Sequence, residues 1–184
     1  MYTTSSQTIG PYLHIGMRWL VDENFAAPGV PGERVTVSGR IVDGDGRPVN
    51  DAMLEIWQAN AAGKYAHPDD PRTLPQDERF SGFGRVFTDE DGGYRFHTIK
   101  PGRVPSADGR LQAPHLNVTI FMRGMLKHLI TRIYFDGDDA NADDPLLATV
   151  PRERVTTLMA KRSASGLQWN VILQGPGETV FFEL

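Results

Sequence analysis

Residues 34–46 read RVTVSGRIVDGDG, and this stretch indicates the fold class. Apolar and polar side chains alternate through residues 34–42, which is the period of a half-buried β-strand. The Asp-Gly-Asp-Gly sequence that follows supplies residues that accept a left-handed backbone, so the strand is expected to end in a tight turn. The chain repeats this combination of a short strand and a polar turn, which predicts an all-β protein.

Seven further segments have the composition of strands, and only one has that of a helix. The expected strands are residues 52–58, 84–88, 94–99, 115–122, 126–135, 168–173 and 179–182. Val155, Leu158 and Met159 recur at helical spacing, with basic residues 161–162 in the expected last turn and Gly166 as the stop. About eight short strands with one late helix describe a β-sandwich or barrel.

The length of 184 residues and the 40% hydrophobic content are those of a chain that forms one compact domain. We assign this single domain to residues 33–184 and treat residues 1–32 as an N-terminal arm. The arm is rich in Ser, Thr, Gly and Pro but also contains Tyr12 and Trp19. Because disordered segments are poor in aromatic residues, we expect the arm to pack on the core or on a partner chain.

The composition excludes several classes of protein and of site. The chain has no cysteine, which rules out a disulfide scaffold, a zinc ribbon, an iron–sulfur cluster and a thiol nucleophile. The net charge is -4 and the basic residues are scattered, so nucleic acid is not an expected partner. We also expect no membrane association and a soluble cytoplasmic protein, because the sequence has neither a signal peptide nor an apolar run of membrane length.

His115 and Asn117 lie two residues apart in an expected strand, so their side chains project from the same face. Two histidines at this spacing would clamp a metal ion, but a neutral amide is a poor ligand for a transition metal. These residues alone leave two interpretations, an incomplete ligand pair or a structural histidine that is hydrogen-bonded to its neighbours.

Arg132 and Tyr65 also allow two interpretations each. The Arg132 guanidinium is either a planar fork for an anionic ligand or one half of an ion pair with the acidic loop that follows at 136–139. Tyr65 lies in a long polar segment, residues 59–81, and either packs under that loop or serves as a phenolate ligand to a nearby metal.

Four segments resemble the intradiol aromatic-ring dioxygenases. They are residues 54–65 (LEIWQANAAGKY), 97–102 (HTIKPG), 114–115 (PH) and 132–138 (RIYFDGD). The resemblance covers nearly the whole chain, and the first block is the most specific. It implies insertion of both atoms of O2 between the two hydroxyl-bearing carbons of a catecholic ring.

The resemblance also implies how far the family's metal site survives in this chain. In the family's catalytic chain, two tyrosines and two histidines bind a ferric ion. The corresponding positions here are Tyr65 and Val104 for the tyrosines, and His115 and Asn117 for the histidines. Gln112 replaces a substrate-side arginine that precedes the histidines. With two of the four ligands lost, we expect a relic site that binds no metal and no catalytic residue in this chain.

Both ends of the chain resemble the α type found in the family's two-chain members. Residues 6–16 (SQTIGPYLHIG) and 177–182 (GETVFF) carry this similarity. It implies that Fe(3+) is bound by a homologous catalytic β chain, and that α and β chains form pairs in a larger hetero-oligomer.

In such a pair, the resemblance places Thr8, Gly10 and Pro11 at the border of the partner's substrate pocket. It further implies that Arg132 adds positive potential around the carboxylate of the substrate, protocatechuate. The implied reaction cleaves protocatechuate with O2 to 3-carboxy-cis,cis-muconate, within aromatic-compound catabolism by the beta-ketoadipate pathway. Two alternatives stay open, a stand-alone β-sandwich binding module that lost the chemistry and an active enzyme with altered ligands.

Overall fold

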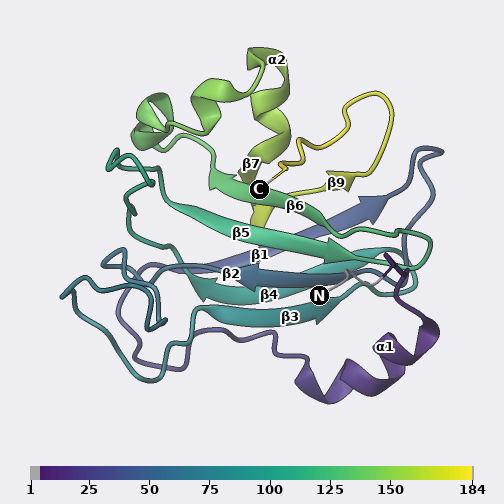
Figure 1. Cartoon of the computed structure of the whole chain (residues 1–184), viewed down its shortest axis with the longest axis horizontal. Coiled ribbons are helices and arrows are strands. Elements are labelled where there is room, and N and C mark those ends of the chain that lie inside the picture. The colour runs from purple at the N-terminus through teal and green to yellow at the C-terminus, as the bar shows by residue number, and fades with distance from the viewer. Residues whose placement is uncertain (1–4, 184) are drawn as a thin grey trace.

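A computed structural model describes residues 5–183, apart from the side chains of His14 and Arg18. The elements are α1 (Pro11–Met17), η1 (Arg18–Leu20), β1 (Arg34–Val42), β2 (Met53–Trp57), β3 (Phe83–Phe87), β4 (Gly93–Ile99), β5 (His115–Phe121), β6 (Leu129–Phe135), η2 (Asp139–Asp143), η3 (Leu147–Thr149), α2 (Arg152–Val155), η4 (Thr156–Leu158), β7 (Met159–Ser163), β8 (Gly166–Gln168) and β9 (Val171–Ile172). Strands dominate and the helices are short, which confirms the all-β prediction (Figure 1).

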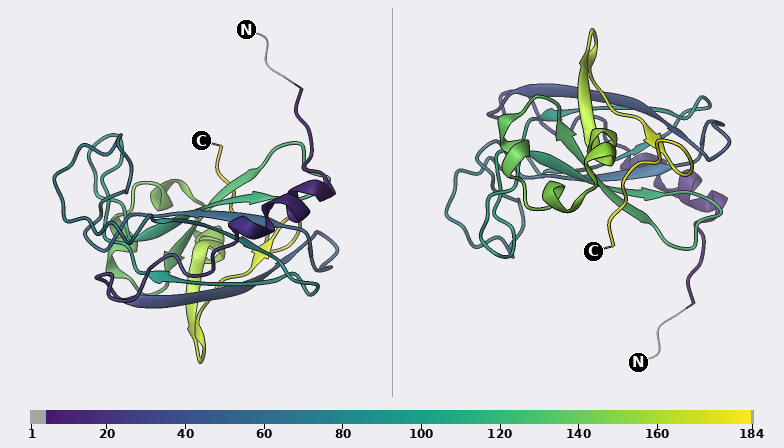
Figure 2. Two further views of the ribbon diagram at one scale, coloured as in Figure 1. Left: turned by 90° about the horizontal axis from the view of Figure 1, so that it is seen from below. Right: turned by 90° about the horizontal axis from the view of Figure 1, so that it is seen from above.

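The strands form one strongly curved, barrel-like sheet in the order β3-β2-β5-β6-β7-β8-β1-β4, with β9 paired to β1. Neighbours are mostly antiparallel, but β6–β7, β1–β8 and β1–β9 pair in parallel. The β7–β8 hairpin connects the two halves of the sheet and projects from the body of the molecule (Figure 2). The face of β3, β2, β5 and β6 that is turned away from the core carries the candidate site.

The period of two in the sequence produces this core. In β5, Leu116, Val118 and Ile120 are fully buried, whereas the residues between them are half-buried on the outer face. Buried side chains from all the long strands join in one cluster. Gly39 is required in β1 because a Cβ at this position would lie 1.7 Å from the carbonyl oxygen of Trp169.

The expected late helix is much shorter than its apolar spacing indicates. Helix α2 and the 3-10 turn η4 end at Leu158, and Met159 begins β7 by pairing with Tyr134 of β6. The basic residues 161–162 therefore lie in a strand, and Gly166 serves the β7–β8 hairpin with a φ of 127°. Pairing with β6 and β8 outweighs the local helical pattern.

Three further boundaries differ from the sequence-based expectation. Residues 11–20 of the arm fold into α1 and η1, with Pro11 at the first helical position. The expected strand at 168–173 is divided into β8 and β9, and the segment 179–182 contributes a single bridge between Ile130 and Phe182. Within residues 5–183, no helix is both long and apolar enough to cross a membrane.

Candidate functional site

The candidate site lies where β5 begins and β6 ends. In this antiparallel pair, His115 is opposite Tyr134 and Asn117 is opposite Arg132. Because side chains alternate between the faces of a strand, these four project from the outer face of the sheet. The register therefore gathers an imidazole, an amide, a phenol and a guanidinium in one place.

Tyr65 reaches this place from the long loop between β2 and β3. The Asn117 amide nitrogen donates to the Tyr65 hydroxyl at 3.2 Å and to the Trp57 carbonyl at 3.3 Å. The Tyr65 and Trp57 rings pack with their centroids 6.0 Å apart. Burial raises the pKa of Tyr65 above its ordinary value, although the Asn117 hydrogen bond opposes this. The structure thus brings Tyr65 and Asn117 together, with Tyr65 as a neutral phenol.

Asp70 fixes the loop that carries Tyr65, and the sequence analysis did not identify it. Its carboxylate accepts from the Tyr65 backbone N–H at 2.9 Å and pairs with Arg72 at 2.5 Å and with Lys64 at 3.4 Å. The hydrogen bond from Arg72 is the main reason that the pKa of Asp70 is held below its usual range. The sequence indicates this role only through the basic residues Lys64 and Arg72, which lie on either side of Asp70.

His115 is buried, with 3% of its surface exposed. Its Nδ1 lies 2.7 Å from the Ala113 carbonyl oxygen, and because a carbonyl only accepts, Nδ1 carries the proton. The opposite nitrogen, Nε2, has no hydrogen-bond partner among the described residues. Burial, followed by the charge of Arg132, lowers the pKa of His115 to about 4, so the imidazole is neutral at pH 7.

This burial predicts an acid-sensitive stability. The pKa of His115 is about 4 in the folded chain against 6.5 in the unfolded one, so the unfolded chain binds the proton first as the pH falls. Folding stability due to His115 is present above pH 6.5 and is lost toward pH 4. Between pH 7 and pH 4.5, His115→Phe is expected to lose about 2 kcal/mol less unfolding free energy than the parent chain. Urea unfolding at both pH values measures this.

His128→Gln, at an exposed histidine, is the matched control and is expected to keep the parent's acid dependence. Equal acid dependence in His115→Phe and the parent chain would contradict the assignment of a buried neutral imidazole.

Gln112 and Val104 lie on the loop that precedes β5. Val104 is buried, and its carbonyl oxygen accepts from the Gln112 backbone N–H at 2.8 Å. The Gln112 side-chain oxygen accepts from Arg132 Nη1 at 2.6 Å. Gln112 therefore makes a polar contact in this site, whereas Val104 contributes only an apolar side chain.

Arg132 is held by neutral groups. Besides Gln112, its Nη1 donates to the Tyr134 hydroxyl at 3.3 Å, and that hydroxyl donates to Asp144 at 3.3 Å. Arg132 forms no ion pair with any residue between 5 and 183. In the acidic loop it is Lys100 that pairs with Asp138, at 2.7 Å. The ion-pair interpretation of Arg132 therefore has no support in this geometry.

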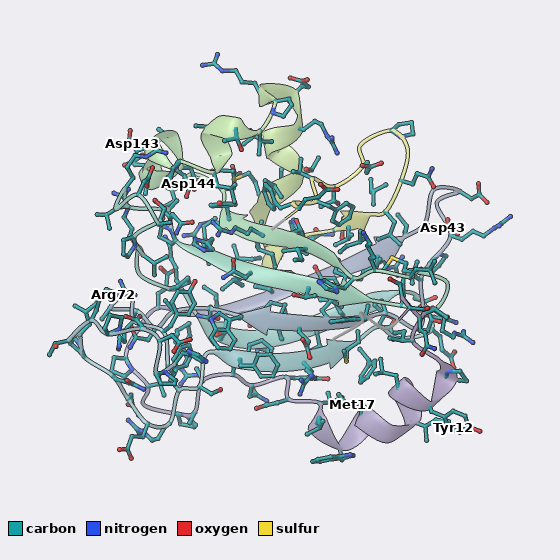
Figure 3. The ribbon with its side chains drawn as sticks, viewed as in Figure 1. Tyr12, Met17, Asp43, Arg72, Asp143 and Asp144 are labelled. Carbon is teal, nitrogen blue, oxygen red and sulfur yellow. The ribbon has the colours of Figure 1, made fainter. Side chains whose placement is uncertain are left out.

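The arm residues Thr8, Gly10 and Pro11 lie far from this site. The Thr8 hydroxyl accepts from the Gly124 backbone N–H at 2.7 Å, in the turn at the other end of the β5–β6 hairpin. The 7 residues of β5 separate the two places by roughly 20 Å. In Figure 3, Arg72 and Asp144 lie at one side of the molecule and Tyr12 of α1 at the other. Within one chain, the arm does not border the relic site.

The residues present do not fit a ferric ion. Val104 has no ligating atom and Asn117 offers only a neutral amide, so only Tyr65 and His115 of the four positions could serve as ligands. Among the described residues, no group of three or more His, Cys, Asp or Glu side chains is placed to hold a metal ion. We therefore derive no chemistry through a metal in this chain.

Comparison with known proteins relates this chain to a family. The family model described as Dioxygenase matches residues 21–175. The protocatechuate 3,4-dioxygenase alpha chain of Burkholderia cepacia is 45% identical, over 98% of this chain and 97% of the relative. This chain belongs to the intradiol dioxygenase family. The protocatechuate 3,4-dioxygenase alpha chain of Pseudomonas putida is 41% identical, over 98% of this chain and 96% of the relative. The beta chain of Burkholderia cepacia is 35% identical, over 95% of this chain and 77% of the relative.

Solved structures of dioxygenases share the fold. The intradiol ring-cleavage dioxygenase of Tetranychus urticae aligns with a TM-score of 0.64 at 22% identity, covering 83% of this chain and 85% of that one. The dioxygenase domain from Streptomyces sp. SirexAA-E aligns with a TM-score of 0.63 at 24% identity, covering 87% and 89%. These two alignments show that the fold is shared. The family resemblance drawn from the sequence is confirmed by the family model and by the two alpha chains.

Proposed function

We propose that this chain is the non-metallated alpha subunit of a protocatechuate 3,4-dioxygenase. In this proposal, a homologous beta chain binds Fe(3+) and cleaves protocatechuate with O2 to 3-carboxy-cis,cis-muconate, in the cytoplasm and within the beta-ketoadipate pathway. Two named alpha chains that match over almost their whole length support the subunit type. The larger particle is then a hetero-oligomer of alpha–beta pairs.

The observation that carries the proposal is the state of the relic site. Val104 and Asn117 stand at two of the four ligand positions, while the fold and the other two positions are kept. Tyr65 and His115 have roles in hydrogen bonding and packing, since Tyr65 accepts from Asn117 and His115 donates to Ala113. A chain that keeps the scaffold without the ligand set is suited to support a partner's site.

Two features of the surface support a contribution to that partner. Thr8, Gly10 and Pro11 are exposed and far from the chain's own relic site, so they are available to border a pocket on another chain. Arg132 carries a positive charge that no carboxylate in the described chain contacts directly, since Asp144 reaches it only through the Tyr134 hydroxyl. Protocatechuate carries a carboxylate, which a guanidinium attracts strongly.

Co-expression with a homologous beta chain tests the proposal. We expect the two chains to co-elute as one large particle, with protocatechuate cleavage in the particle and none in this chain alone. A stable monomer that does not bind the beta chain would instead support a stand-alone binding module. Size-exclusion chromatography with an oxygen-uptake assay distinguishes these results.

A further inference from the structure

Hydrogen bonds join four side chains in the order Asp144, Tyr134, Arg132 and Gln112. We call these four residues the arginine network. We propose that Gln112 and Tyr134 are positioning residues that hold the Arg132 guanidinium in place without cancelling its charge. The proposal rests on the role of Arg132 proposed above and extends it to residues whose chemistry explains how that charge is kept fixed and available.

The Gln112 end of the arginine network is held by three further hydrogen bonds. Gln112 is 9% exposed, and its side-chain nitrogen donates to the Pro105 carbonyl at 3.3 Å, which directs its oxygen toward Arg132. Its backbone is held on both sides, because its N–H donates to Val104 and its carbonyl accepts from Arg103 at 3.2 Å. The acceptor for Arg132 is therefore oriented before any substrate arrives.

The Tyr134 end is anchored by a buried carboxylate. Asp144 is 1% exposed and accepts from the backbone N–H groups of Ala113, Leu146 and Leu147 at 2.7–2.9 Å. Tyr134 donates its hydroxyl proton to Asp144, so the phenolic oxygen is left to accept from Arg132. The carboxylate thus orients the arginine through a neutral group rather than by direct contact.

The groups that hold Arg132 determine how much of its positive charge is neutralised. A carboxylate bound directly to a guanidinium neutralises it, whereas an amide oxygen and a phenol oxygen accept its hydrogen bonds and leave the positive charge. Both anchors use the same nitrogen, Nη1. Nε is buried without a hydrogen-bond partner in the described chain, whereas Nη2 has no partner there and is left to face an anion. The arrangement fixes a guanidinium whose charge remains available to attract an anion.

Substitutions in the assembled alpha–beta enzyme separate position from charge. Gln112→Met and Tyr134→Phe each remove one anchor, and we expect the KM for protocatechuate to rise about three- to fivefold. Gln112→Glu keeps an acceptor but adds a neutralising charge, so we expect a rise of about tenfold. The KM for unsubstituted catechol and both kcat values are expected to change less than about twofold.

Gln168→Met, at an exposed glutamine in β8, is the matched control and is expected to change neither KM. Equal effects of Gln112→Met on both substrates, or no effect on either, would overturn the positioning role. If Arg132→Ala alone raises the KM for protocatechuate selectively, only the positioning proposal fails. If Arg132→Ala is unselective too, the proposed role of Arg132 fails. Should Tyr134→Phe not assemble, Gln112→Met decides.

Discussion

Arg132→Ala in the assembled alpha–beta enzyme is expected to raise the KM for protocatechuate about tenfold and the KM for catechol less than about twofold. The reason is electrostatic, because only protocatechuate brings a carboxylate to a guanidinium that has no acidic partner in the described chain. Steady-state kinetics with both substrates at low and at high salt measure the difference, which is expected to shrink as ions screen the charge.

Arg85→Ala is the matched control for this prediction. Arg85 lies on the same outer face of the sheet, but its guanidinium is paired with Glu55 at 2.6 Å, so its removal changes the local charge much less. Arg132→Lys keeps the charge and loses the planar fork, and is expected to give an intermediate KM. Equal effects of Arg132→Ala on both substrates would reduce Arg132 to a structural residue.

Deletion of residues 1–12 is expected to abolish assembly with the beta chain or to raise the KM for protocatechuate at least tenfold. The deletion removes Tyr12, which has 82% of its surface exposed in α1, whereas Ile15 and Trp19, with 67% and 79% exposed, remain in the shortened chain. Exposed aromatic residues of this kind are typical of interfaces between chains. The chain's own melting temperature is expected to change little, because among the described residues 5–12 the one hydrogen bond to the body joins Thr8 to Gly124.

Single substitutions refine the deletion. Trp19→Ser is expected to weaken co-elution with the beta chain, while Leu74→Ser, at an exposed leucine in the loop on the other side of the molecule, is expected to leave it unchanged. Unchanged particle size and unchanged kinetics after the deletion would show that the arm contributes neither to assembly nor to substrate binding. The division into an arm at 1–32 and a domain at 33–184 stays a prediction.

The strands could be predicted because their burial is local and periodic. Residues 34–42 alternate in sequence and form β1 with the same bounds, and the Asp-Gly turn signals mark its end. The length of the late helix could not be predicted, because Met159 pairs with Tyr134 of β6, a residue distant in sequence, and so begins a strand. The split of 168–173 has the same origin, since Trp169 lies between β8 and β9 and is buried against β1 and β4.

The candidate site was only partly predictable. Alternation placed His115 and Asn117 on one face, but the contact between Asn117 and Tyr65 joins residues 52 positions apart and depends on the fold. Family resemblance supplied the relic positions. It gave no indication of Asp144, whose role follows only once the structure brings it to Tyr134 and Ala113.

Iron analysis of the separated chains tests the central claim most directly. The co-purified particle is dissociated, the alpha and beta chains are separated, and iron content and visible absorption are measured on each chain and on this chain expressed alone. We predict that all the iron and the visible charge-transfer band belong to the beta chain and the intact particle. Stoichiometric iron with a visible band in this chain alone would contradict the account.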